Sequence, residues 1–265
     1  MVQAMTATHT KMRSKAKPRL RAVPAVTRAA AILRLLAHSD RPFRLQAIAK
    51  ELVLVPSTCL HILRALAVEE LVALDEDTKT WRLGAGLLSL SRKLLRGNGF
   101  ATIVQDVLEQ LAQKYSVTAI GLEVHGLDHV VVVAISRGHQ PFHIHVEVGS
   151  RFPALISASG RCIAAFGEHD DDEIEARFRL VRWDQPPSYA RWRREVKEAR
   201  RARFSTDINC YIRGVTVIAA PILRGSQVRN LLVVVGLTER LQGEVDSIGK
   251  KLLEHAALVA ERLEM

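Results

Sequence analysis

A segment from Pro56 to Glu69 combines an apolar stripe with polar side chains on its other side. Four apolar residues at helical spacing form the stripe: Cys59, Ile62, Leu63 and Leu66. The opposite face carries short polar or basic groups: Ser57, Thr58, His61 and Arg64. Hydroxyl, imidazole and guanidinium groups on one helix face can hydrogen-bond to phosphates and to base edges in the major groove. The segment therefore predicts a helix that reads DNA.

The surrounding segments predict the elements that hold this helix. Periodic apolar residues predict helices at 25–37 and 44–52, and a three-residue connection, 53–55, leads into the helix that Pro56 opens. The alternating segments LVAL and WRLG, separated by a polar turn, predict a hairpin with residues 78–80 at its tip. This order is the plan of a winged helix-turn-helix. In it, Arg44 and Arg64 face the DNA backbone, and three wing residues reach an adjacent minor groove: Lys79, Thr80 and Arg82.

The positive charge of the chain is concentrated in its first hundred residues. Residues 1–100 hold 17 Lys/Arg against 7 Asp/Glu, whereas residues 101–265 hold 21 of each. Eight Lys/Arg precede the first acidic residue, Asp40, so residues 1–22 are interpreted as a disordered basic arm. A basic half joined to a neutral half indicates an anionic partner for the first half.

The remainder of the chain predicts a linker and a second domain. Residues 84–95 have the pattern of a linker helix, Gly97-Asn98-Gly99 suggests a hinge, and residues 100–115 predict another helix. Beyond residue 117, β-rich segments that include the alternating PFHIHVEV are mixed with helices, among them a basic helix at 188–203 and a closing helix at 240–263. This mixture predicts an α/β sensor domain.

One turn in the second half has the chemistry to hold an acid. Ser159 and Gly160 are expected to open a helix, whose first N–H groups and positive end favour a carboxylate. Arg161 and Cys162 directly follow this turn, and two placements of Arg161 stay open: beside the site or pointing to solvent.

Other polar groups are interpreted as structural. His143 and His145 share a strand face, but no third ligand with convincing spacing completes a metal site. The run Asp170–Asp172 starts a helix, where its charge complements the helix dipole. In the Arg-rich helix at 188–203, Glu195 and Glu198 alternate with the cations, which favours a solvated amphipathic face over a second nucleic-acid surface.

The motifs of both halves, in this order, resemble the IclR family of transcription regulators. In the first half the resemblance rests on TRAAAILRLLA, LQAIAKEL, PSTCLHILRAL and the wing with WRLG. In the second it rests on VGSRFPALISASGRCIAAF, DINCYIRGVTVIAAPIL and VVVGLTERL.

The resemblance implies a homodimer or a dimer of dimers, whose GAF-like second domain binds a small metabolite. It also implies which residues line the effector pocket: Ala158, Ser159, Gly160, Asp207, Val215, Val217, Val233 and Val235. Relatives that bind small keto acids carry Cys or Ser at several of the four valine positions. The valines favour a more apolar pocket here, suited to a larger or aromatic acid.

The complete sequence-based prediction is an α+β protein in four parts. It has a basic arm (1–22), a winged helix-turn-helix (23–84), a linker helix and hinge (85–99) and a GAF-like effector and oligomerisation domain (100–265). We expect an operator-binding regulator in a reducing cytoplasm, with no cofactor, metal, catalytic residue or membrane contact. The open alternatives are a constitutive DNA-binding dimer whose second domain only oligomerises, and an enzyme, for which the sequence supplies no nucleophile or acid/base pair.

Overall fold

A computed structural model describes residues 23–37, 39, 41–97, 99–139, 146–225 and 227–264, with the backbone alone for residues 92–97. The chain divides into two compact units, the first ending at Arg96 and the second beginning at Gly97. The arm (1–22), Asn98 of the expected hinge, and the pair His143 and His145 lie outside the described residues.

The first unit is a winged helix-turn-helix, as predicted. Its elements are α1 (Pro24–Ala37), β1 (Phe43–Arg44), α2 (Leu45–Glu51), α3 (Pro56–Val68), β2 (Val72–Asp75) and β3 (Thr80–Leu83). The strands form an antiparallel sheet in the order β1-β3-β2. Leu63 and Trp81 are among the residues of its apolar core, which α1, α2, α3 and the hairpin share. Helix α4 (Gly86–Gly97) follows, where the sequence predicts the linker.

The turn between α2 and α3 sets the direction of the DNA-facing helix. The chain bends by 112° between the two helices, within the range of helix-turn-helix motifs. Val53, in the turn, has a φ of 52°, and its N–H donates to the carbonyl of Lys50 at 3.2 Å. Among the described residues no single helix is long and apolar enough to cross a membrane; only this bent pair reaches the required length and apolarity.

The second unit is built on one antiparallel sheet of six strands in the order β6-β5-β4-β9-β8-β7. Its strands are β4 (Thr118–His125), β5 (His129–Arg137), β6 (Arg151–Pro153), β7 (Ser205–Ile208), β8 (Val215–Arg224) and β9 (Gln227–Leu237). Its helices are α5 (Gly99–Tyr115), α6 (Ser157–Phe166), α7 (Asp171–Phe178), α8 (Tyr189–Ala202), α9 (Thr238–Leu241) and α10 (Val245–Glu264).

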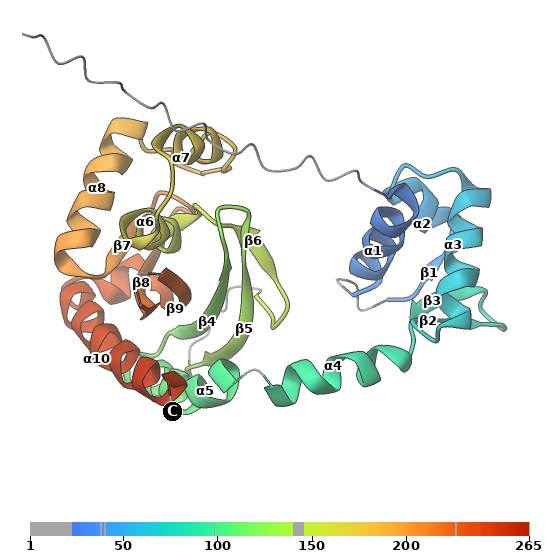
Figure 1. Cartoon of the computed structure of the whole chain (residues 1–265), viewed down its shortest axis with the longest axis horizontal. Helices are drawn as coiled ribbons and strands as arrows, with labels where there is room; N and C mark the ends of the chain where they lie inside the picture. The colour runs from blue at the N-terminus through green and yellow to red at the C-terminus, as the bar shows by residue number, and fades with distance from the viewer. Residues whose placement is uncertain are drawn as a thin grey trace, which may run out of the picture. The chain divides into compact units, whose positions relative to one another are not determined.

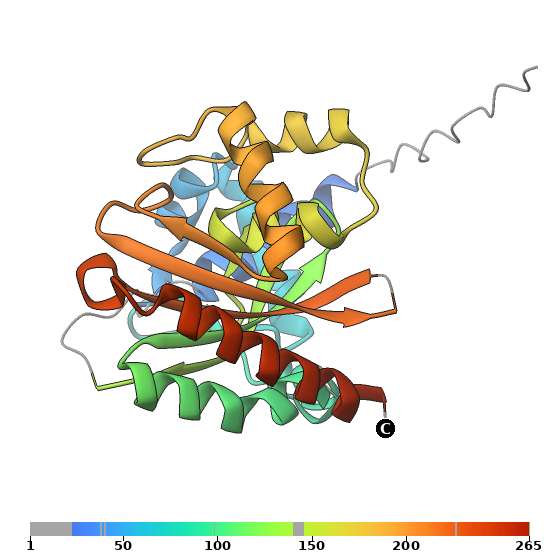
Figure 2. The ribbon, with the colours of Figure 1, turned by 90° about the vertical axis from the view of Figure 1, so that its left-hand side faces the viewer.

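Helices cover both faces of this sheet and give it two apolar cores. Helices α5 and α10 run side by side along one face, and α6, α7 and α8 lie over the other (Figures 1 and 2). Because successive strand residues point to opposite faces, β8 and β9 contribute to both cores: Val217 faces α6, for example, and Ile218 faces α10.

Two expected elements differ from the prediction. Val146 to Val148, the described end of the PFHIHVEV segment, are not in a strand; residues 151–153 pair with β5 instead, and Val132 N–H donates to Ser150 O at 2.9 Å. The closing helix is divided into α9 and α10, because Gly243 between them has a φ of +88°.

Candidate DNA-reading face and effector site

Helix α3 holds its polar face free of internal contacts. Cys59, Leu63 and Leu66 are buried against the rest of the first unit, which turns the opposite face to solvent. Ser57, His61 and Arg64 are exposed and Thr58 is half-buried. Within the described chain, none of these four side chains makes a hydrogen bond or ion pair, so their donors are available to a ligand.

Arg44 and the wing add further donors. Arg44 is exposed and precedes α2. At the tip of the wing, the Asp75 carboxylate accepts hydrogen bonds from the N–H groups of Thr78 (2.9 Å) and Asp77 (3.0 Å), which lower its pKa. Lys79 pairs with Glu76 at 2.9 Å, but both are largely exposed, so phosphate competes for the ammonium at little cost.

The α6 site differs from the prediction at its helix start. Helix α6 begins at Ser157, so Ser159 and Gly160 lie inside the first turn. The Gly160 N–H already donates to Ile156 O at 2.8 Å and is not free for a ligand. Glycine is needed there for a steric reason: a Cβ would lie 2.2 Å from the backbone carbon of Leu155.

Of the two placements left open for Arg161, the structure excludes the one in solvent, because Arg161 is 1% exposed. Its guanidinium donates to Glu195 Oε2 through Nε (2.8 Å) and Nη2 (2.6 Å), to Asp207 Oδ2 at 3.1 Å and to Ser157 O at 2.8 Å. The Trp183 ring centroid lies 5.9 Å from its Cζ. A buried guanidinium needs carboxylate partners, and these come from α8 and β7.

Both carboxylate oxygens of Asp207, a predicted effector ligand, accept hydrogen bonds from within the protein. Its Oδ2 accepts from Arg161, and its Oδ1 accepts from the N–H groups of Cys210 (3.0 Å) and Tyr211 (3.2 Å). In the sheet Asp207 pairs with Val217, which pairs in turn with Val235.

The four predicted pocket valines form one apolar surface under α6. Val215, Val217, Val233 and Val235 are all buried in the same cluster as Ala158. Next to them, the Ser205 hydroxyl donates to Ala158 O at 2.6 Å, and burial raises the pKa of the Cys162 thiol to about 12. The structure thus brings the four valines together under α6. Val217 pairs in the sheet with Asp207, the residue that binds Arg161.

Some polar atoms on this side of the sheet were not anticipated. Ser157 Oγ, Trp183 Nε1 and Trp192 Nε1 are buried with no hydrogen-bond partner among the described residues. Ser157 also has a φ of +50°, in the left-handed region that costs free energy for a residue with a Cβ. A single arginine in the otherwise uncharged segment ISASGRCIAAF was the sequence signal for the buried network.

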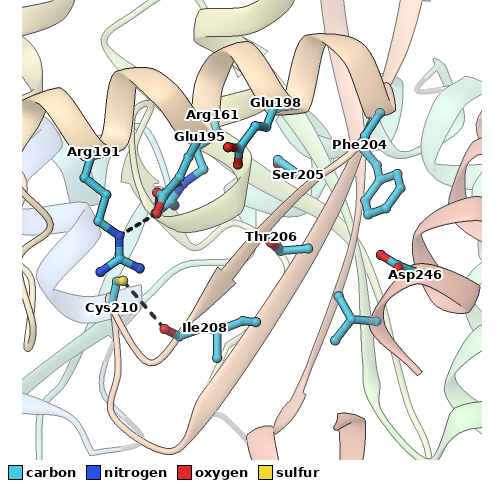
Figure 3. Close-up of a pocket in the computed structure, with 13 residues that line it drawn as sticks. Arg161, Arg191, Glu195, Glu198, Phe204, Ser205, Thr206, Ile208, Cys210 and Asp246 are labelled. Atoms are coloured by element: carbon cyan, nitrogen blue, oxygen red, sulfur yellow. Dashed lines mark hydrogen bonds and ion pairs between the residues drawn. The ribbon is translucent and has the colours of Figure 1, made fainter. Parts of the chain in front are cut away.

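A separate pocket of about 440 Å³ lies at the outer edge of β7, between α8 and the start of α10 (Figure 3). Arg161, Arg191 and Glu195 form part of its wall, and Glu198 and Asp246 line it without an ion pair in the described chain. None of the eight predicted effector residues lines this pocket.

Comparison with known proteins identifies both units. Residues 25–76 match the IclR helix-turn-helix domain, and residues 93–261 match the C-terminal domain of the bacterial transcriptional regulator IclR. The chain belongs to the IclR family. Its two units are therefore the DNA-binding and effector-binding domains of a transcription regulator, and the predicted fold is confirmed.

Individual relatives support this assignment. The glycerol operon regulatory protein of Streptomyces griseus is 29% identical over 203 residues, covering 76% of this chain and 80% of the relative. The IclR regulator of Alicyclobacillus acidocaldarius superposes with a TM-score of 0.77 at 26% identity, over 91% of this chain and 99% of that one. An IclR homologue of Microbacterium hydrocarbonoxydans, complexed with 4-hydroxybenzoate, has the same fold at a TM-score of 0.75 and 20% identity, over 91% and 99% of the two chains.

Proposed function

We propose that this IclR-family regulator binds a double-stranded operator with α3 and its wing. An aromatic carboxylic acid bound under α6 changes its affinity for that operator. The observation that carries the proposal is the polar face of α3, whose side chains have no partner in the described chain. Residues 23–84 bind DNA, 85–99 couple the domains, and 100–265 bind the effector and oligomerise.

Each DNA-binding residue has a role set by its chemistry. Ser57, Thr58 and His61 sit toward the start of α3, the part of a recognition helix that reaches base edges. Arg44 and Arg64 bind backbone phosphates, where charge matters more than shape. From the wing, three residues enter an adjacent minor groove: Lys79, Thr80 and Arg82.

The effector is an acid with an apolar, ring-sized body. The four valines provide the apolar wall, and the free N–H groups at the start of α6 attract the carboxylate. Because Arg161 neutralises Asp207, that carboxylate does not repel an acidic ligand. The 4-hydroxybenzoate in the Microbacterium homologue supports this ligand class. Ala158, Ser159 and Gly160 line the pocket, with the unpartnered Ser157 hydroxyl as an additional donor.

We further propose a homodimer, or a dimer of dimers. Leu88 and Leu90 of α4 are 71% and 63% exposed. Exposed leucines on a helix that links two domains are suited to burial against a second copy.

The DNA-binding half is tested with sequences selected by the protein from random 30-bp duplexes. We expect the combined variant Arg44→Ala, Thr58→Ala, His61→Ala to bind the selected duplex at least about 100-fold more weakly, since each good contact contributes about 1–3 kcal/mol. Unchanged binding by a folded variant contradicts the assigned reading face.

The effector half is tested by thermal shift with benzoate, 4-hydroxybenzoate and pyruvate. We expect the two aromatic acids to raise the unfolding midpoint more than pyruvate does, because only they fill an apolar pocket. Stabilisation by none of the acids favours the alternative, a constitutive DNA-binding dimer whose second domain only oligomerises.

A further inference from the structure

Helix α8 carries more Lys and Arg side chains than form ion pairs within the described chain. It contains six Lys/Arg and two Glu, and Arg203 follows at its end. Two of the cations are paired: Arg191 with Glu195 at 2.8 Å and Arg193 with Asp171 at 2.8 Å. The other four are exposed and make no ion pair or hydrogen bond within the described chain; we call them the α8 ridge: Arg194, Lys197, Arg200 and Arg201.

The acid expected to neutralise this face is turned inward. Glu195 Oε2 accepts two hydrogen bonds from the buried Arg161, and its Oε1 accepts from Arg191, so Glu195 is only 21% exposed (Figure 3). Glu198 is the one acidic residue left on the exposed part of α8, and it lines the pocket beside β7. The exposed side of α8 is solvated and amphipathic, as the sequence-based interpretation expects, but it carries the four cations of the ridge and only one acid.

The ridge is continuous along the helix. At 100° per residue, its four cations fall within an arc of about 120° on the side away from the buried Trp192, Val196 and Ala199. Residues 194 to 201 span about 10 Å along the axis. That length matches about three phosphates of one DNA strand, which carries one charge per 3.4 Å of axis.

We infer that the α8 ridge is a second phosphate-binding surface, for double-stranded DNA; this inference rests on the proposed function. Three of its four cations are arginines, whose planar forks match phosphate oxygens. Contacts between such cations and backbone phosphates do not depend on the base sequence.

The experiment compares two full-length triple variants on a random-sequence 60-bp duplex. The ridge variant is Arg194→Gln, Lys197→Gln, Arg201→Gln. The matched control, Arg229→Gln, Lys250→Gln, Arg262→Gln, removes the same charge from exposed residues outside α8 that make no ion pair with the described part of the chain. Affinity is measured by fluorescence anisotropy from 50 to 200 mM NaCl, and circular dichroism melting checks that both variants are folded.

We expect the ridge variant to bind about tenfold or more weakly at 50 mM NaCl, and its slope of log K against log salt to be shallower by about 2–3, since each phosphate contact contributes about 0.9. The control is expected to keep the wild-type slope. Equal slopes for the two variants overturn the inference. A changed oligomer mass in light scattering with an unchanged slope also overturns it and assigns the ridge to a protein contact. If the wild type binds no duplex, the proposed function itself fails.

Discussion

Helices α3 and α6 contain similar residues, but most of α6 is buried and most of α3 is not. Each has serine in its first turn, one buried cysteine and one arginine: Arg64 in α3 and Arg161 in α6. Helix α3 buries three of its 13 residues, whereas α6 buries eight of ten. The first unit covers one face of α3, while the sheet and α8 cover α6 from two sides. The number of covered faces thus decides whether an arginine stays exposed, as Arg64 does, or meets a buried carboxylate, as Arg161 does.

The largest effect that this comparison predicts is the loss of Arg161. In Arg161→Met, the carboxylates of Asp207 and Glu195 lose their partner, and we expect a loss of about 3–5 kcal/mol in the free energy of unfolding, because uncompensated buried charge is costly. Urea denaturation followed by circular dichroism measures it. The control Arg194→Met, on the exposed ridge, is expected to change stability by no more than about 0.5 kcal/mol. Similar losses for both variants contradict the buried network.

A smaller effect tests the apolar wall under α6. Val217→Thr keeps the shape but buries a hydroxyl among valines, so we expect a loss of about 1–3 kcal/mol in stability and a weaker thermal shift with benzoate. Val259→Thr makes the same change in the other core, on α10 itself. That control is expected to lose similar stability while keeping the normalised benzoate shift. A full benzoate shift in the Val217 variant argues that the acid binds elsewhere.

The exposed arginine of α3 gives a smaller effect still, seen in DNA binding alone. Arg64→Gln removes one phosphate contact, so we expect binding about three- to tenfold weaker for all sequences alike, with a salt slope shallower by about 0.9. Stability is expected to stay within about 0.5 kcal/mol of the wild type. A loss confined to one base sequence indicates instead that Arg64 reads a base.

The smallest expected effect is that the cysteines of the two helices, Cys59 in α3 and Cys162 in α6, do not react with an alkylating reagent. The Cys162 thiol, with its pKa of about 12, and Cys59, whose pKa burial also raises, stay protonated at pH 7.5, and only thiolates react. We expect no alkylation of either by iodoacetamide in the folded protein, as judged by mass spectrometry, and full alkylation in urea. Modification of Cys162 without urea shows that α6 opens to solvent.

The sequence by itself determined the elements and their broad roles. The apolar stripe of α3 and the alternating strands of the wing are local patterns, and each predicted an element that the fold contains. The excess positive charge lies in the same part of the chain as the helix-turn-helix match. Three of the four residues of the predicted stripe of α3 are buried, and Ile62 is half-buried. Periodicity alone therefore separates the two faces at most positions, because one covered face leaves the other to solvent.

Only the tertiary structure decided how the charges of the second domain are used. Arg161 meets Glu195 and Asp207, 34 and 46 residues further along the chain, and no local pattern specifies such a contact. The same packing gives both carboxylate oxygens of Asp207 a hydrogen-bond donor. It also turns Glu195 toward Arg161, so that Glu195 does not pair with the cations of the α8 ridge. Burial on two sides depends on which distant elements meet, and that is a property of the folded chain.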